Sequence, residues 1–171
     1  METLIRRALP GDAAGIARIV TDAPWFPHDP EHSPHAGTPT IRETLDTRSD
    51  DATTILVAVE RTSQELVGYA TVHWHPYVML GGWEGLVAEL FVSAAARGNG
   101  IGTALLERVR AEAEEHGCVR LSLLNGRDSE SYRSGFYRKR GWRERTEIAN
   151  FVLGLERRPE MPGREREGGR R

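Results

Sequence analysis

The sequence has one cysteine, one lysine and no long hydrophobic run. Cys118 is the single cysteine among 171 residues, which excludes an intramolecular disulfide and a zinc site built from cysteines. No stretch approaches the roughly 18 apolar residues that span a bilayer. Residues 1–9 contain Glu2, Arg6 and Arg7, so they lack the apolar core of a signal peptide. We therefore expect a cytoplasmic protein with no membrane partner.

A large charge of one sign is also lacking. Of the 23 cationic residues only Lys139 is a lysine, and the formal net charge is −2. Nucleic-acid-binding domains normally present a basic face or stripe, so no nucleic-acid partner is expected. The hydrophobic and charged fractions, 39% and 28%, are those of an ordinary globular domain, and the length suits a single core.

The order of the expected elements indicates a mixed α/β fold. Alternating or continuous apolar runs predict strands at residues 3–8, 53–59, 66–75, 86–92 and 119–124, and a final hairpin at 142–146 and 150–155. Helical periodicity predicts helices at residues 13–20, 40–48, 100–116 and 129–140. The resulting order is β-α-α-β-β-β-α-β-α-β-β. It gives a central, mixed, mostly antiparallel sheet of six to seven strands with one βαβ unit.

Three stretches show no such periodicity. Residues 24–39 are rich in Pro and His and are expected to form a long loop, and residues 76–85 are expected to connect two strands. Residues 156–171 consist almost entirely of Arg, Glu, Gly and Pro, a composition that cannot bury enough apolar surface to fold. The expected folded domain is therefore residues 1–155, followed by a disordered tail.

A glycine-rich segment, Arg97-Gly98-Asn99-Gly100-Ile101-Gly102, joins an apolar strand to the strongest helix. Backbone N–H groups and the helix dipole favour an anion such as phosphate at this position. A P-loop would place Lys and then Ser or Thr after its last glycine, whereas Thr103 directly follows Gly102. The dinucleotide motif G-x-G-x-x-G also fails, because Thr103 or Leu105 stands at its third glycine. The alternative without a ligand is a turn that lets the helix pack closely on the strand.

The same segment resembles a family signature. Val92, Arg97, Gly98, Gly100 and Gly102 resemble the V-x-x-x-x-[QR]-G-x-G-x-[GA] motif of GNAT acetyltransferases, and the element order over residues 3–155 is also that of the family. The resemblance implies a GNAT fold and acetyl-CoA as co-substrate, with no metal. It further implies contacts of the coenzyme with Leu90, Phe91, Val92, Arg97, Gly98, Asn99, Gly100, Ile101, Gly102, Thr103 and Asn125. Residues 90–92 would pair with the pantetheine arm, and residues 98–103 would cradle the pyrophosphate.

A second motif supplies a candidate acid. Phe136-Tyr137 with Gly141-Trp142 resembles the F-Y-x-x-x-G-[FW] segment of the family, and the resemblance makes Tyr137 the general acid for the departing thiolate. The alternative is a core tyrosine with its hydroxyl at the surface. Many family members have an asparagine seven residues before this tyrosine, where Glu130 stands here. Asn125 is the nearer chemical match to that coenzyme contact.

Glu89 is the candidate base, because it alone interrupts an apolar strand and a buried carboxylate needs an explanation. An ion pair with an arginine, or an exposed position, is the structural alternative. His73 and His75 are rival bases, and alternation places both on one face of their strand.

The acceptor is expected to contact Trp25, Phe26, His73 and His75. Trp74, Tyr77 and Trp83 suggest that its pocket is partly apolar. His28, His32 and His35 have the spacing of metal ligands on a helix, but Pro30 and Pro34 interrupt them, so a solvated loop is expected. Cys118 has no base beside it in the sequence and is interpreted as a buried filler.

These features predict an acetyl-CoA-dependent N-acetyltransferase that moves an acetyl group to a primary amine by direct transfer in a ternary complex. A small-molecule amine is the expected acceptor, and a homodimer is a further option. A non-catalytic acyl-CoA-binding sensor or regulatory domain is the alternative. A nucleotide-binding module is disfavoured by the glycine spacing.

Overall fold

A computed structural model describes residues 1–22, 37–49 and 51–153. The chain forms two compact units, Met1–Asn125 and Gly126–Arg171. No helix in the described ranges combines the length and the apolar character that crossing a membrane requires.

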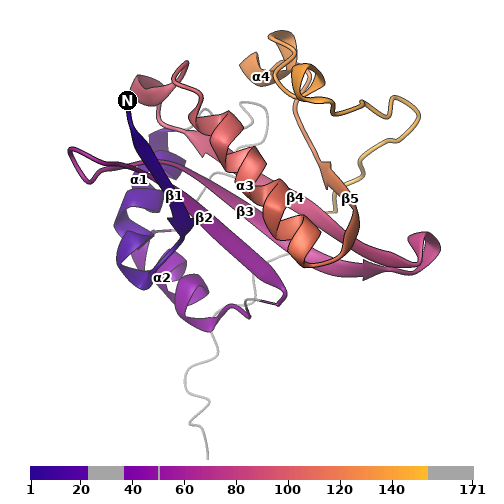
Figure 1. Cartoon of the computed structure of the whole chain (residues 1–171), viewed down its shortest axis with the longest axis horizontal. Helices are drawn as coiled ribbons and strands as arrows, with labels where there is room; N and C mark the ends of the chain where they lie inside the picture. Colours follow the sequence, from indigo (N-terminus) through magenta and orange to yellow (C-terminus); the bar gives the residue numbers. More distant parts are fainter. Residues whose placement is uncertain (23–36, 50, 154–171) are drawn as a thin grey trace, which may run out of the picture. The chain divides into compact units, whose positions relative to one another are not determined.

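The first unit is built on a five-stranded sheet (Figure 1). Its strands are β1 (Thr3–Arg7), β2 (Thr53–Glu60), β3 (Leu66–Tyr77), β4 (Gly82–Val92) and β5 (Cys118–Leu123). They lie in chain order, with antiparallel pairing from β1 to β4 and parallel pairing of β4 with β5. The expected mixed, mostly antiparallel sheet is confirmed, and the helix α3 (Ile101–Glu115) completes the expected βαβ unit.

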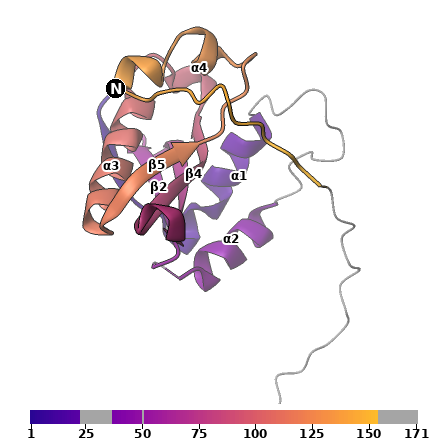
Figure 2. The same cartoon turned by 90° about the vertical axis from the view of Figure 1, so that its right-hand side faces the viewer.

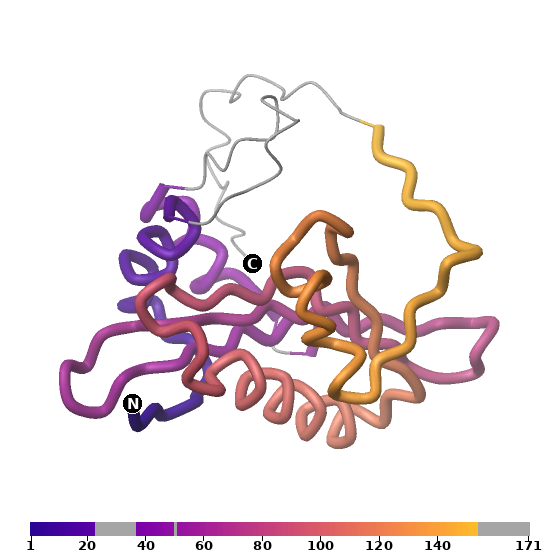
Figure 3. The backbone as a smooth tube through the Cα atoms, turned by 90° about the horizontal axis from the view of Figure 1, so that it is seen from above, coloured from indigo at the N-terminus to yellow at the C-terminus, as the bar shows by residue number. Residues whose placement is uncertain are grey.

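Helices lie on both faces of this sheet (Figure 2). α1 (Ala13–Asp22) and α2 (Thr38–Thr47) lie on one face, and α3 lies on the other, as the backbone tube also shows (Figure 3). The core under α1 contains Ile16, Val57 and Tyr69. On the opposite face, a Cβ added to Gly68 would lie 3.2 Å from Ile101 Cγ2. Alternation along β3 therefore sends Tyr69 toward α1 and its neighbour Gly68 toward α3.

The helix α3 matches its sequence pattern. Ile101, Leu105, Val109 and Ala113, which recur every four residues, are all buried. The helix is followed by Gly117, whose φ of 65° is a left-handed conformation that glycine adopts without strain.

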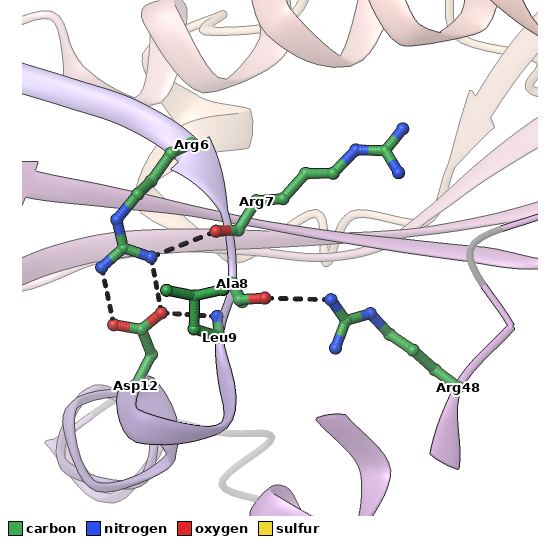
Figure 4. Close-up of polar contacts among 6 residues, drawn as sticks. All are labelled: Arg6, Arg7, Ala8, Leu9, Asp12 and Arg48. Atoms are coloured by element: carbon green, nitrogen blue, oxygen red, sulfur yellow. Dashed lines mark hydrogen bonds and ion pairs between the residues drawn. The ribbon is translucent and has the colours of Figure 1, made fainter. Parts of the chain in front are cut away.

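Side chains at the end of β1 fix the turn into α1 (Figure 4). Arg6 donates hydrogen bonds of 2.6 and 2.9 Å to the two carboxylate oxygens of Asp12, and the Leu9 N–H donates to Asp12 at 2.7 Å. Arg48, which follows α2, donates to the Ala8 carbonyl oxygen at 2.9 Å. The end of β1 is thus tied to both helices on its face.

The expected connection at residues 76–85 is much shorter in the structure. β3 continues to Tyr77 and β4 begins at Gly82, which is its register partner. Only residues 78–81 connect the strands, and Gly81 makes the turn with φ of 63°. Gly81 and Gly82 mark a tight turn, and Pro76 lies near the end of β3, so these residues do not indicate a long loop.

In the second unit the expected helix at 129–140 is broken. α4 spans only Glu130–Arg133, and a 3-10 helix spans Arg138–Arg140. Gly135 lies between them with φ of 67°, a conformation that an α-helix cannot contain.

The expected final hairpin is also absent: residues 142–153, the described part of it, contain no strand. Glu144 accepts a hydrogen bond from Tyr132 and forms ion pairs with Arg127 and Arg138 within the same unit. These contacts lie within the second unit, and the sheet of the described residues has five strands. The expected tail, residues 156–171, lies outside the described residues.

Candidate active site

The loop from Arg97 to Gly102 has the backbone conformation that an anion site needs. Gly98 and Gly100 have φ of 79° and 78°, and a Cβ on either would meet nothing within 4 Å. Glycine is thus required by conformation and not by crowding. Gly100 is the N-cap of α3 and provides no side-chain cap, so the first turn of the helix faces the loop with its backbone N–H groups.

Asn99 stabilises this loop internally. Its side-chain amide donates to the carbonyl oxygens of Ala96 and Arg97, each at 3.2 Å, and Arg97 Nε donates to the Val92 carbonyl oxygen at 3.3 Å. The two side chains therefore connect the loop to itself and to the end of β4. Coenzyme contacts of Gly98, Ile101, Gly102 and Thr103 remain predictions.

Strands β4 and β5 separate before β4 ends. Their register pairs run from Trp83 with Cys118 to Val87 with Leu123, while β4 stays paired with β3 up to Val92. Beyond Val87, β4 thus has β3 as its only neighbouring strand in the described part of the sheet. This is the segment, Leu90 to Val92, that the resemblance assigns to the pantetheine arm. Asn125 follows the end of β5 and is partly buried.

A shallow hollow lies at the same end of β4. Phe91, Val92 and Arg97 line it, together with Ile19 and Asp22 of α1 and the adjoining Ser93 and Ala94. Three residues expected to contact the coenzyme therefore share one surface.

Glu89 lies on the α1 face of β4 and is partly buried. A β-bulge puts it there: Thr71 pairs with Glu89 but the next residue, Val72, pairs with Val87, so Ala88 is an extra residue in β4. Thr71 Oγ1 donates a hydrogen bond of 2.6 Å to Glu89 Oε2. The arginine partner considered from the sequence is not found among the described residues. Instead, the carboxylate is held by a hydroxyl group.

Tyr69 is the second group beside Glu89, and the sequence alone gives no hint of it. Its side chain is 1% exposed and stacks on Phe91, with ring centroids 5.7 Å apart. Burial and then the neighbouring Glu89 charge raise the pKa of Tyr69 well above its usual value. Its hydroxyl has no hydrogen-bond partner of normal geometry in the part of the chain that the structure describes.

His73 and His75 continue the same face of β3 toward the hairpin. His73 is exposed, and its Nδ1 lies 3.0 Å from Thr53 Oγ1. His75 Nε2 lies 3.8 Å from Glu84 Oε2, a carboxylate that Arg120 also binds at 2.6 Å. The structure thus brings His73, His75 and Glu89 onto one side of the sheet.

Trp74 does not belong to this surface. It is 3% exposed, donates to Thr54 Oγ1 at 2.9 Å and stacks on His116 at the end of α3. It is a core residue of the α3 face, because strand alternation turns it away from His73 and His75. Trp25 and Phe26, and the histidines at 28, 32 and 35, lie outside the described residues.

Tyr137 belongs to the second unit, so its position relative to the loop and Glu89 stays a prediction. Its ring packs edge-on against Phe136 and Trp142, with centroids 5.0 and 6.0 Å away. Burial raises the pKa of Tyr137 to about 12, so the phenol is fully protonated at neutral pH.

Cys118 is partly buried at the start of β5. Burial, and then the charge of Glu84, raise the pKa of its thiol. A thiol that resists ionisation is a poor nucleophile, which agrees with the packing role expected from the sequence.

Comparisons with known proteins identify the family of this chain. The sequence profile described as "Acetyltransferase (GNAT) family" matches residues 18–142. No curated protein sequence matches the chain.

Solved structures share the fold at low sequence identity. A transcriptional regulator from Bacillus halodurans C-125 superposes with a TM-score of 0.75 and 22% identity, over 90% of this chain and 100% of that one. A ribosomal-protein-alanine N-acetyltransferase from Brucella melitensis biovar Abortus 2308 gives 0.68 and 22%, over 91% and 100%. An aminoglycoside acetyltransferase from an uncultured soil metagenomic sample gives 0.69 and 21%, over 91% and 100%.

At such identities these likenesses show the fold alone. The family match, in contrast, covers most of the chain and includes α3, the glycine loop that precedes it and the Tyr137 segment. The chain therefore belongs to the acetyltransferase (GNAT) family.

Proposed function

We propose that this protein transfers the acetyl group of acetyl-CoA directly to the primary amine of a small molecule. The observation that carries the proposal is the geometry at the end of β4. There the strand parts from β5 after Val87 and leads into a loop with left-handed Gly98 and Gly100 at the start of α3. A strand segment that pairs with only one other strand in the described sheet suits an extended amide-containing arm, and the helix start suits a pyrophosphate.

The proposed donor site uses groups of known type. Backbone groups of Leu90, Phe91 and Val92 would pair with the pantetheine arm, and residues 98–103 would cradle the pyrophosphate. Acetyl-CoA supplies an activated thioester. This chain would supply binding, orientation and proton transfers.

Proton transfers are assigned to Glu89 and Tyr137. Glu89 would take a proton from the acceptor ammonium, because only the neutral amine can attack a carbonyl carbon. Tyr137 would give its proton to the departing thiolate, which its raised pKa of about 12 permits at neutral pH. The tyrosinate would then take the second proton, which the nitrogen loses as the amide forms. No covalent enzyme intermediate is needed, in keeping with the raised pKa of the Cys118 thiol.

The acceptor would approach from the face of β3 that carries His73 and His75. It would also contact Trp25 and Phe26, which lie outside the described residues. Neighbours of the same fold are named for an aminoglycoside and for a ribosomal-protein alanine, so the fold leaves the acceptor open. We favour a small molecule because polar side chains, from His73 and His75 to Glu84 and Arg120, occupy the described part of this face.

Mass-resolved acetyl transfer tests the proposal. The full-length protein is incubated with acetyl-CoA and a panel of amines, amino acids and aminoglycosides, and product mass and free thiol are measured together. We expect one acetylated amine per thiol released. Cys118→Ser should retain the activity, because direct transfer does not use the thiol.

The contrary result would be tight coenzyme A binding, seen by calorimetry, without transfer to any amine. That result would favour the non-catalytic acyl-CoA sensor. Binding of ATP or NAD in place of coenzyme A would instead favour a nucleotide-binding module.

A further inference from the structure

The partly buried Glu89 has different surroundings from the two buried acids of the first unit. Glu84 and Glu112 each accept hydrogen bonds from arginine, and each is at most 3% exposed. Glu89 has no arginine partner in the described ranges. It accepts instead from the uncharged Thr71 hydroxyl at 2.6 Å. A carboxylate paired with arginine is fixed in its charged state, whereas one held by a hydroxyl keeps the capacity to accept a proton.

Tyr69 completes this arrangement from the adjacent position on the same face. It stands two residues before Thr71 on β3, so both hydroxyl-bearing side chains point to the α1 side of the sheet. Its hydroxyl has no hydrogen-bond partner of normal geometry among the described residues, and burying a hydroxyl in this way costs free energy. The Glu89 charge is close enough to raise the pKa of Tyr69.

We propose that Thr71 and Tyr69 are positioning residues that hold Glu89 in place as the base of the transfer reaction. Thr71 fixes Oε2, so that Oε1 is directed to the acceptor, and Tyr69 places its hydroxyl beside the charged carboxylate. This inference rests on the proposed function and deepens it. Neither residue touches the substrate.

The proton balance of the step is simple. Glu89 Oε1 takes one proton from the acceptor ammonium, which leaves a neutral amine and a neutral carboxylic acid. The proton then passes from the acid to water, and the carboxylate returns to its hydrogen bonds. The hydrogen bond from Thr71 and the nearby Tyr69 hydroxyl favour the charged form over the acid, so they restore the base after each turnover.

Several other groups on this face can titrate or carry charge, and the test must separate them from Glu89. They are Tyr69, His73, His75 and Tyr77 of β3, Glu84 of β4, Arg120 of β5, and Asp22 of α1 beside Phe91. Glu89→Gln removes the proposed base alone. If kcat/KM for the amine still falls at acidic pH in this variant, that fall belongs to one of the other groups.

The pH profile of kcat/KM for the amine tests the proposal. Thr71→Val and Tyr69→Phe each remove one hydroxyl and keep the shape of the side chain. Each should move the acidic limb to higher pH, by about one to two units where the lost hydroxyl donates a hydrogen bond to the charged carboxylate. Thr71→Ser keeps the hydroxyl and should restore the wild-type limb. Thr44→Val is the matched control on α2, where the hydroxyl donates to its own helix at Thr40; its limb should not move.

The outcomes separate the inference from the proposed function. Absence of transfer by the wild-type protein contradicts the function, and an unchanged limb in Glu89→Gln contradicts the base. The inference itself is tested when the wild type is active and Glu89→Gln lacks the acidic limb of the kcat/KM profile. In that case the inference is overturned if this limb lies at the wild-type pH in both Thr71→Val and Tyr69→Phe.

A measurement without substrate tests the inference whether or not acetyl transfer is observed. In protein with ¹³C-labelled glutamate, the carboxyl resonance of Glu89 is followed by NMR during a pH titration. Its midpoint should rise in Thr71→Val and Tyr69→Phe and stay unchanged in Thr44→Val. Thermal unfolding should show both variants folded, because Phe and Val retain the packing against Phe91 and the sheet.

Discussion

At the scale of single residues, the acid role of Tyr137 can be separated from its packing role. Tyr137→Phe keeps the ring contacts with Phe136 and Trp142 but removes the proton that would go to the thiolate. We expect kcat to fall about 100-fold, the lower range for loss of general acid catalysis. The Kd for coenzyme A should stay within about twofold. Steady-state kinetics and calorimetry measure the two quantities.

Tyr132→Phe is the matched control for this prediction. Tyr132 lies in the same unit, and its hydroxyl donates to Glu144 at 3.0 Å. Its loss should leave kcat nearly unchanged. Equal losses of kcat in the two variants would assign the effect of Tyr137→Phe to local structure and not to proton transfer.

Glu112 is a residue whose role is structural. It is 1% exposed on α3, and it accepts from Arg7 at 2.5 Å and from Arg108 at 2.9 and 2.6 Å. Glu112→Gln removes the charge from these hydrogen bonds. The free energy of unfolding should fall by about 1–2 kcal/mol at neutral pH.

Urea denaturation measures this change, and Glu114→Gln is its control. Glu114 lies on the same helix and pairs with Arg110 at 3.0 Å, but both side chains are largely exposed. An exposed pair of this kind contributes little, so the control should unfold with the wild type. A similar loss in both variants would indicate a general effect of charge on α3.

The residues around Glu89 show what one sequence can and cannot predict. Glu89 itself is visible as a charge in an apolar strand. Its neighbours Thr71 and Tyr69 cannot be predicted in this way, because they come from β3 through a register that the bulge at Ala88 shifts by one residue. A register depends on two strands and the turn between them, so no pattern within one strand defines it.

At the scale of elements, local signals predicted structure best. The helix α3 follows from the period of its apolar residues and the glycine after it, and both act within a few residues. The predicted final hairpin is wrong, since strand pairing is non-local and a pattern within one segment does not define it. Glu144 instead forms ion pairs with Arg127 and Arg138 within the second unit. The helix after β5 failed at Gly135, whose left-handed conformation a helical period does not reveal.

The loop before α3 is the element whose conformation bears directly on donor binding. Gly98→Ala and Gly100→Ala each place a Cβ at φ near 80°, where an L-residue loses roughly 1–2 kcal/mol. No steric contact adds to this, since each Cβ would have open space. The bound conformation should become less populated, and the affinity for coenzyme A should fall about 10-fold.

Calorimetry with coenzyme A measures that affinity, with Gly11→Ala as the control. Gly11 also has open space around a Cβ, but its φ lies outside the left-handed region. The control should bind coenzyme A like the wild type. Unchanged affinity in both loop variants would mean that this loop does not hold the pyrophosphate.

At the scale of the first unit as a whole, three acidic residues connect different helices, strands and turns through ion pairs with arginine. Asp12 joins the 3-10 turn before α1 to Arg6 of β1, and Glu84 joins β4 to Arg120 of β5. Glu112 joins α3 to Arg7 of β1 and also pairs with Arg108 of its own helix. Burial alone would raise the pKa of each carboxyl. Hydrogen bonds from the arginines, and their charges, outweigh burial and leave all three pKa values below their usual range.

Acid stability should therefore depend on these three groups together. A carboxyl whose pKa is lower in the folded state stabilises the fold at pH values above its unfolded pKa, about 4. That contribution is lost as the pH falls through the folded pKa. The melting temperature of the wild type should thus be nearly constant from neutral pH to about pH 5 and decrease steeply below about pH 4. The difference between the wild type and Glu112→Gln should shrink over the same acidic range, because the wild type loses the charge that the variant never had. Differential scanning calorimetry from pH 3 to pH 8 measures both, and a difference that stays constant or grows at low pH would contradict the lowered pKa of Glu112.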